Sequence, residues 1–129
     1  MYRTILSALM VSVALTATAA AKSPQKKPVA ISFQEDVLPI MQAHCVVCHA
    51  PGGDGYEKSG LDLRSYDGLM KGTKFGAVVV PGDAETSNLL VLLDGRADKS
   101  LKMPHGKKKL TTCDRDLIRN WIHEGAKNN

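Results

Sequence analysis

The stretch "HCVVCHA", residues 44–50, constrains this chain more than any other part of its sequence. It places Cys45, Cys48 and His49 within five positions, although the chain of 129 residues has only three cysteines. Three cysteines cannot all pair among themselves, so either one is left over or the close pair is committed to other chemistry. The position of the pair, directly before an imidazole, favours the second possibility.

Residues 1–21 predict the compartment that these thiols meet. They combine one positive charge at Arg3, an apolar stretch and an A-x-A-like run of small residues, which are the three parts of a secretory signal peptide. The apolar stretch is shorter than the roughly 20 residues that span a bilayer. We expect cleavage after Ala21, with Ala19 as the alternative site, export to the periplasm and no membrane span after cleavage. An uncleaved N-terminal anchor is the competing interpretation.

The rest of the chain predicts an all-α domain with long connecting loops. Residues 22–31 are expected to form a flexible lead-in rich in proline and lysine, and residues 32–127 the single domain. Ser32 and Glu35 form an S-x-x-E capping box that starts a helix, and Pro39 should kink it or end its first part. Residues 50–60 are expected to be loop.

Three further helices are predicted. A short one covers residues 65–71, and another, capped by Asp83 or Ser87, runs to about residue 93. The last begins at a T-x-x-D cap, Thr111 with Asp114, and ends at Gly125. One face of this last helix carries an apolar stripe, which consists of Leu117, Ile118, Trp121 and Ile122.

The sequence C-x-x-C-H is the attachment motif of a c-type haem. Two residues between the thiols allow Cys45 and Cys48 to reach the two vinyl groups on one edge of a porphyrin. His49 then stands beneath the ring, where its imidazole can coordinate iron. We therefore expect one haem c, covalently attached through both cysteines.

Three alternatives compete with haem attachment. The pair could be a disulfide or a thiol–disulfide redox site, but such motifs follow a strand, and none is predicted before Ala43. A zinc site could use Cys45, Cys48, Cys113 and one histidine, although Cys113 lies in an ordinary helix start. The motif could also be a coincidence.

Haem iron held by one histidine needs a second axial ligand or keeps an open position. Met103 is the favoured ligand because it follows the motif at a distance that lets the chain circle the ring, in the loop K-M-P-H-G, which Pro104 stiffens. His105 and an open position are the alternatives. The other candidates are assigned elsewhere: Met41 and Met70 to packing, His123 to the surface, and His44 to the near side of the ring.

With these features the chain resembles a class I monohaem c-type cytochrome, and within that group the planctomycete-type cytochrome c domain. The resemblance runs from about Phe33 to Ala126 and includes "FQEDVLPIMQAHCVVCHAP", "SGLDLRSYDGLMKG", "VVVPGDAETSNLL", "KMPHGKKKLT" and "IRNWIHEGA". It implies a cytochrome c-like fold in which about four helices and long loops wrap the haem. It also implies haem attachment at Cys45 and Cys48, axial ligands His49 and Met103, and packing of the first helix against the last, which would bring Phe33 near Trp121.

Two positions depart from the family pattern. His105 stands where the family usually has a second proline, so a nitrogen ligand lies two residues from the sulfur of Met103. Cys113 stands where the family usually has an acidic or small residue. We interpret Cys113 as a half-buried small residue in the first turn of the last helix.

The resemblance implies an electron carrier rather than an enzyme. The lysines beside the proposed ligand loop would steer docking onto acidic redox partners; they are Lys99, Lys102, Lys107, Lys108 and Lys109. The net charge of +4 is mild, and no nucleic-acid partner is expected. We expect a monomer. The alternative function is a haem-based enzyme or gas sensor, peroxidase-like or gas-binding, in which the sixth iron position is open or labile.

Overall fold

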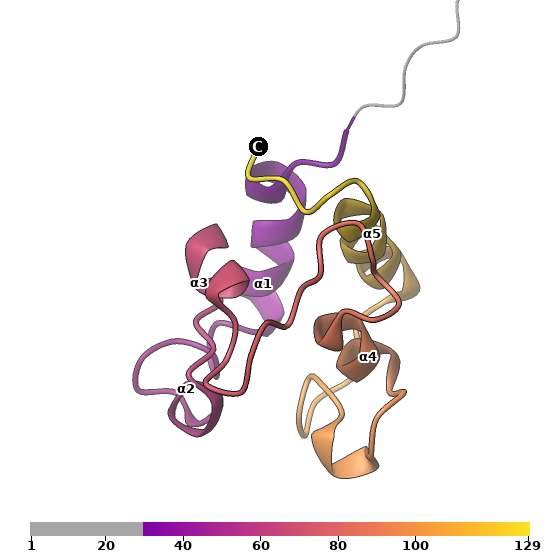
Figure 1. Cartoon of the computed structure of the whole chain (residues 1–129). Coiled ribbons are helices and arrows are strands. Elements are labelled where there is room, and N and C mark those ends of the chain that lie inside the picture. The colour runs from indigo at the N-terminus through magenta and orange to yellow at the C-terminus, as the bar shows by residue number, and fades with distance from the viewer. Residues whose placement is uncertain (1–29) are drawn as a thin grey trace, which may run out of the picture.

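The structure, a computed structural model, describes residues 30–129. The predicted signal peptide and most of the predicted lead-in lie outside the described residues. Within residues 30–129 the chain contains five α-helices and two single-turn helices, and its only strand-like pairing is a bridge between Thr73 and Gly76. The expected all-α architecture is confirmed (Figure 1).

The first helix has two parts that meet near Pro39. A π-helical turn, η1 (Phe33–Val37), leads directly into α1 (Leu38–His44), with Pro39 in the first turn of α1. Proline has no N–H to donate and clashes with the carbonyl four residues earlier, so the regular α-helical register cannot pass through it. The predicted interruption therefore takes the form of a change from π to α.

The cap at the start of η1 differs from the expected one in its acidic partner. Ser32 Oγ accepts a hydrogen bond from Glu35 N at 3.1 Å, as predicted. The carboxylate that returns to Ser32 N belongs to Asp36, at 2.8 Å, and not to Glu35. A π turn places one more residue in each turn than an α turn, so the residue that faces the cap moves by one position.

The middle of the chain forms two short helices before the longer loops. These are α2 (Asp54–Ser59) and α3 (Tyr66–Lys71). The structure confirms α3, whose first turn is capped by Ser65 Oγ, which accepts from Gly68 N at 3.1 Å. The loop expected over residues 50–60 is wrong, because α2 occupies its second half.

The last part contains α4 (Asn88–Asp94), a single 3₁₀ turn, η2 (Lys99–Leu101), and α5 (Thr112–His123). Ser87 precedes α4, but its hydroxyl does not cap the helix; it donates to Asp83 O at 2.7 Å and accepts from Val80 N at 2.8 Å. Thr111 Oγ1 caps α5 as predicted and accepts from Asp114 N at 3.1 Å.

The core lies where the two ends of the domain meet. Helix α5 packs against both η1 and α4, and the three are seen together in the upper and right parts of Figure 1. The predicted stripe of α5 faces this core: Ile118, Trp121 and Ile122 are fully buried and Leu117 is half-buried. Phe33 lies 5.4 Å from Trp121 between ring centroids, which confirms the contact that the family resemblance implies.

The C-terminal residues close this core by binding the start of the first helix. Asn129 O accepts from Gln34 N at 3.1 Å and from Ser32 Oγ at 2.7 Å, and Asn129 Oδ1 accepts from Phe33 N at 3.1 Å. The first N–H groups of a helix lack partners within the helix, so these bonds act as a cap supplied from the other end of the chain. Among residues 30–129 no helix has the length and apolar character needed to cross a bilayer.

Candidate functional site

The C-x-x-C-H motif continues directly from the end of α1. Cys45 N donates to Met41 O at 2.8 Å, and Cys48 N and His49 N both donate to Cys45 O, at 3.0 and 2.9 Å. These bonds fold the motif into a tight turn. The turn presents two thiols and one imidazole from a single short segment, as attachment to one flat cofactor requires.

The two cysteines of the motif lie in different environments. Cys48 is exposed, whereas Cys45 is half-buried, and burial raises the pKa of the Cys45 thiol to about 11. The neighbouring Cys48 raises this pKa further, and the positive charge of Lys107 lowers it. Both thiols are free, so they are available for two separate covalent bonds.

The environment of the His49 imidazole favours its neutral form. Burial lowers its pKa, and the nearby backbone of Leu61 only partly opposes this effect. His49 Nδ1 is buried and makes no hydrogen bond of normal geometry. A neutral imidazole has a lone pair to give, which is the form that binds iron.

Helix α2 packs its backbone directly onto the motif. Tyr56 N donates to Cys48 O at 2.9 Å. A Cβ at Gly55 would lie 2.8 Å from His49 Cε1 and 2.9 Å from Cys48 O, and one at Gly53 would lie 2.5 Å from Cys48 O. Only glycine allows this approach. The sequence of α2 has no helical periodicity of apolar residues, so the helix was not predicted. Its glycines, which indicated a loop, allow the helix to pack closely against the motif.

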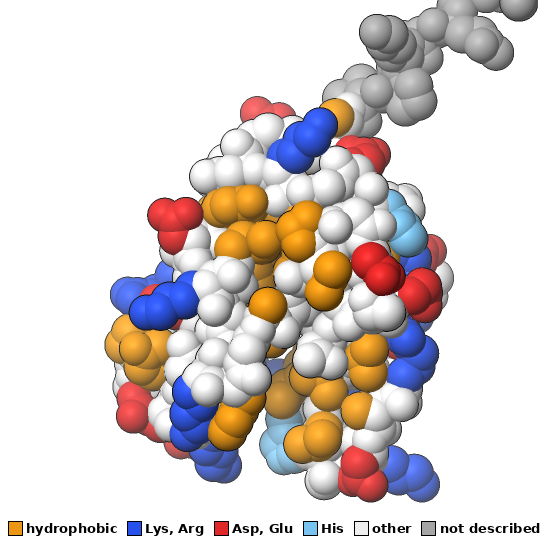
Figure 2. All heavy atoms as spheres, in the orientation of Figure 1, with side chains coloured by type: hydrophobic (Ala, Val, Ile, Leu, Met, Phe, Trp, Pro, Cys, Tyr) orange, Lys and Arg blue, Asp and Glu red, His pale blue; other side chains and the backbone are white. Residues whose placement is uncertain are grey.

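A cleft that is partly open to solvent lies beside the motif. Its walls are mostly apolar and come from distant parts of the chain. They consist of the motif residues His44, Cys45, Cys48 and His49, the leucines Leu63, Leu89 and Leu93, and the loop residues Met103, Pro104, His105 and Lys107. Figure 2 shows an opening at the lower edge of the molecule, with histidine and apolar side chains at its mouth.

These residues fit a c-type haem. The walls supply apolar contact for a porphyrin, and the same cleft holds two thiols for covalent attachment, the imidazole of His49 and the thioether of Met103. Cys45, Cys48, His49 and Met103 are thus brought together although the chain separates Met103 widely from the motif. Their roles as attachment sites and ligands stay predictions.

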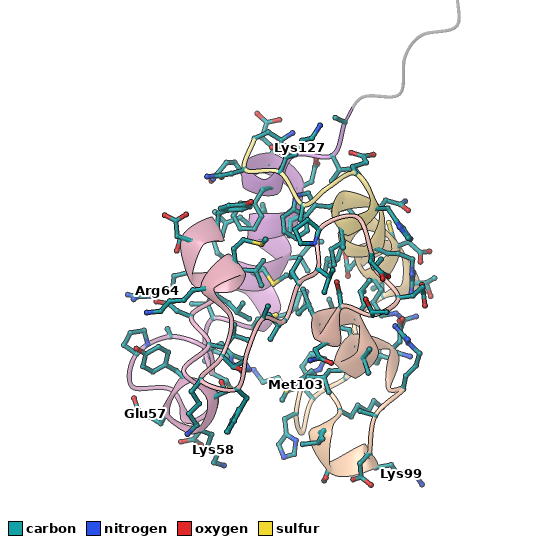
Figure 3. The ribbon with its side chains drawn as sticks, in the orientation of Figure 1. Glu57, Lys58, Arg64, Lys99, Met103 and Lys127 are labelled. Atoms are coloured by element: carbon teal, nitrogen blue, oxygen red, sulfur yellow. The ribbon has the colours of Figure 1, made fainter. Side chains whose placement is uncertain are left out.

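Met103 reaches the cleft from the loop that follows α4. Its backbone N–H donates to Leu92 O, near the end of α4, at 3.3 Å. Met103 lies close to α4 in Figure 3, whereas Lys99, which precedes it in the same loop, lies farther from α4. Its side chain is half-buried, whereas the neighbouring His105 is exposed. Both line the cleft, so both distal candidates remain within its reach.

Three of the other candidate ligands lie where the sequence predicts. Met41 is buried in the core, Met70 packs against the core and His123 is exposed on α5. Cys113 is also exposed, so the expectation of a half-buried residue is wrong; the apolar stripe of α5 turns other positions inward. Within residues 30–129 no three histidine, cysteine or acidic side chains gather closely enough to hold a metal ion.

The lysines that precede and follow Met103 are all exposed; they are Lys99, Lys102, Lys107, Lys108 and Lys109. Lys107 lines the cleft itself. Lys109 differs from the others because its Nζ donates to Asp94 O at 3.0 Å, so this lysine has a structural partner.

Comparison with known proteins identifies one family. Residues 45–105, from the first cysteine of the motif to His105, match the family model of planctomycete cytochrome C. No curated protein and no solved structure matches the chain. The matched segment contains the motif and most of the walls of the cleft, and such domains bind c-type haem and serve electron transfer. The helical domain of this chain is therefore cytochrome c-like, and residues 45–105 within it are similar to planctomycete cytochrome C.

Proposed function

We propose that this chain is an exported, non-enzymatic electron-transfer protein that carries one covalently attached haem c with His49 and Met103 as axial ligands. The observation that carries the proposal is the convergence of Cys45, Cys48, His49 and Met103 on one apolar cleft. The predicted signal peptide supports a periplasmic location, where thioether attachment takes place.

Each residue of the cleft has a defined task in this proposal. Cys45 and Cys48 hold the porphyrin through thioether bonds, so the haem cannot be lost from an exported protein. His49 and Met103 would hold the iron through an imidazole nitrogen and a thioether sulfur. When bound, the haem supplies a one-electron couple between ferric and ferrous iron, and a His/Met ligand pair raises its potential.

The leucine walls keep water away from the buried part of the ring. Leu89 and Leu93 are almost fully buried on α4, and Leu63 lines the same cleft from the segment before α3. A low-dielectric environment disfavours the extra positive charge of ferric iron, so these walls favour the reduced form. The exposed Lys107 and Lys108 would direct an acidic partner toward the mouth of the cleft.

A haem-based enzyme or sensor is the second candidate, and the presence of His105 on the cleft wall favours it. In that case Met103 would not hold the iron, and the exposed imidazole of His105 would assist chemistry at an open sixth position. The two candidates predict different spin states, because two strong axial ligands give a low-spin iron.

The first experiment is expression with the signal peptide in a host that has the haem-attachment machinery. The purified protein should weigh one haem more than its mature polypeptide, give a pyridine haemochrome spectrum of a c-type haem, and show low-spin bands with the weak far-red sulfur-to-iron feature. The variant in which Cys45 and Cys48 are both alanine is the control and should carry no covalent haem. Colourless wild-type protein would overturn the proposal, and high-spin haem that readily binds carbon monoxide would favour the second candidate.

A further inference from the structure

The position of Met103 depends on the last turn of α4. Leu92 O accepts two hydrogen bonds, from Gly95 N at 3.2 Å and from Met103 N at 3.3 Å, and Val91 O accepts from Arg96 N at 2.9 Å. Gly95 has a φ of +73°, the left-handed conformation that ends a helix in this way. The ligand loop, residues 95–110, therefore leaves the end of α4 and returns to it at Met103.

Asp94 lies in this last turn of α4, where a carboxylate is unfavourable by itself. The partial negative charge at the C-terminus of a helix repels it. Three guanidinium groups compensate: Arg119 Nη2 lies 2.8 Å from Asp94 Oδ2, Arg115 Nε lies 3.5 Å from Oδ1, and Arg96 Nε lies 3.7 Å from Oδ2. The Asp94 side chain is only 18% exposed, so solvent screens these contacts less than it screens an ordinary surface pair.

Two of the three arginines belong to α5. Arg115 and Arg119 are four residues apart, hence on one face of that helix, and both point to Asp94. Arg115 Nη1 is buried without a hydrogen-bond partner, which makes Asp94 the group that compensates this guanidinium. The C-terminal end of the ligand loop also binds the end of α4, because Lys109 Nζ donates to Asp94 O at 3.0 Å.

We propose that Asp94, with Arg115 and Arg119, forms a clamp that fixes the end of α4 to α5 and so positions Met103 in the cleft. Asp94 affects the position of Met103 indirectly, through Leu92 O and the ligand loop. It is a positioning residue and does not contact the iron ligands or the haem. The proposal rests on the proposed function in one respect, namely that Met103 is the distal ligand. The effect of the clamp on the position of the loop does not depend on that role.

The test compares two conservative variants of the haem-loaded protein. Asp94→Asn removes the charge that joins α4 to α5. Asp116→Asn is the control, because Asp116 also pairs with Arg119 but lies on α5 itself. Both remove one carboxylate from the same group of charges.

Two measurements report on the loop. Amide hydrogen exchange follows the Met103 N–H, with the Ala126 N–H, which donates to Trp121 O, as the reference for the rest of the domain. Titration with imidazole measures how readily an outside ligand replaces the thioether. Because a hydrogen-bonded charge is lost, Asp94→Asn should increase Met103 exchange and imidazole affinity by about tenfold or more. Exchange at Ala126 should change far less, and Asp116→Asn should stay within about twofold of wild type in both measurements.

The clamp is overturned if Asp94→Asn changes Met103 exchange no more than Asp116→Asn does, or if Ala126 exchange rises equally. Arg119→Gln gives an independent check if the first variant folds poorly: it removes the shortest contact to Asp94 and should speed Met103 exchange similarly, whereas exchange at the wild-type rate also overturns the clamp. If the wild-type protein lacks the far-red sulfur-to-iron band, Met103 is not the iron ligand, but the clamp is not contradicted. Hydrogen exchange at the Met103 N–H then tests the clamp by itself.

Discussion

The aromatic ring of Phe33 packs against the indole of Trp121, with a distance of 5.4 Å between ring centroids, and joins the start of the first helix to the last helix. Tyr66 completes the cluster, with its ring 5.3 Å from Phe33 and its hydroxyl donating to Ala126 O at 2.9 Å. The cluster lies in the part of the fold that holds η1 and α5 together, and η1 continues into α1, which ends in the C-x-x-C-H motif. The orientation of the motif therefore depends on this contact.

The two phenylalanines of the chain allow a direct test of this cluster. Phe33 is fully buried, so Phe33→Ala should lower the free energy of unfolding by about 3–5 kcal/mol. Phe75 is 80% exposed, and Phe75→Ala should change it by less than about 0.5 kcal/mol. Denaturant unfolding of the haem-loaded protein measures both. Equal effects of the two substitutions would contradict the central role of the Phe33–Trp121 contact.

Replacement of Met103 tests the distal ligand. Met103→Ala should keep its covalent haem, because Cys45 and Cys48 are unchanged, but should lose low-spin character and the far-red band and bind carbon monoxide. Met70→Ala is the control, since Met70 packs against the core away from the cleft, and its spectrum should match wild type. An unchanged spectrum in Met103→Ala would show that another group binds the iron, and the double variant that also lacks His105 would identify it.

The close approach of α2 to the motif predicts a strict requirement for glycine at position 55. Gly55→Ala forces a Cβ to within 2.9 Å of His49 Nε2 and Cys48 O, so α2 or the imidazole must move. We expect a loss of about 1–3 kcal/mol in the free energy of unfolding and an altered haem spectrum.

Gly52→Ala is the control for this substitution. Gly52 has a φ of +87° but nothing within 4 Å of its added Cβ, so the variant introduces backbone strain without a clash. It should lower stability and leave the spectrum of the haem unchanged. If Gly55→Ala also leaves the spectrum unchanged, α2 does not control the orientation of His49.

Charge reversal at the mouth of the cleft tests partner docking. Lys107→Glu, at the cleft wall, should slow electron exchange with an acidic redox partner and flatten its dependence on salt concentration. Lys127→Glu makes the same change in charge at the opposite end of the molecule, where Figure 3 shows Lys127, and should leave the rate within about twofold of wild type. Lys109 is unsuitable for this comparison because it also binds Asp94 O. Stopped-flow kinetics over a range of salt concentrations measures the rates, and equal rates for the two variants would exclude local steering.

The ligand loop should also show a pH signature at Asp98. The hydrogen bonds that the Asp98 carboxylate accepts from Ser100, first from its hydroxyl and then from its backbone N–H, lower the pKa of Asp98. A lowered folded-state pKa means that this carboxylate stabilises the fold above its ordinary pKa of 3.8, and that the stabilisation is lost as the pH falls through the folded value.

The Ser100→Ala variant checks this assignment. Without the hydroxyl, the pKa of Asp98 should move upward toward its ordinary value, and an NMR titration of the haem-loaded protein measures it. Thr86→Ala, which alters the corresponding contact to Asp83 elsewhere, should leave Asp98 unchanged. A pKa that does not move in Ser100→Ala would show that the turn before Met103 is not capped in this way.

Local sequence signals were sufficient for several parts of the fold. The cap of α5 by Thr111, the buried stripe around Trp121 and the short helix α3 follow from side chains only a few residues apart, so their patterns can be read along the chain. The prediction that Glu35 is the acidic partner of Ser32 is wrong, because η1 is π-helical and Asp36 takes that place. Single π turns are rare, so a capping pattern that is interpreted from the sequence assumes α-helical spacing.

The haem chemistry of this protein can be predicted from the order of its residues, because the spacing of thiols and imidazole in C-x-x-C-H is local and holds wherever the motif folds. The surroundings of the motif depend on how the chain packs in three dimensions. Helix α2 against His49, Met103 on the wall of the cleft and the contact of Asp94 with Arg119 all join residues that are distant in the chain or hidden among glycines. These contacts depend on the packing of α2 on the motif and of α4 on α5. They cannot be predicted from any periodic pattern in the sequence.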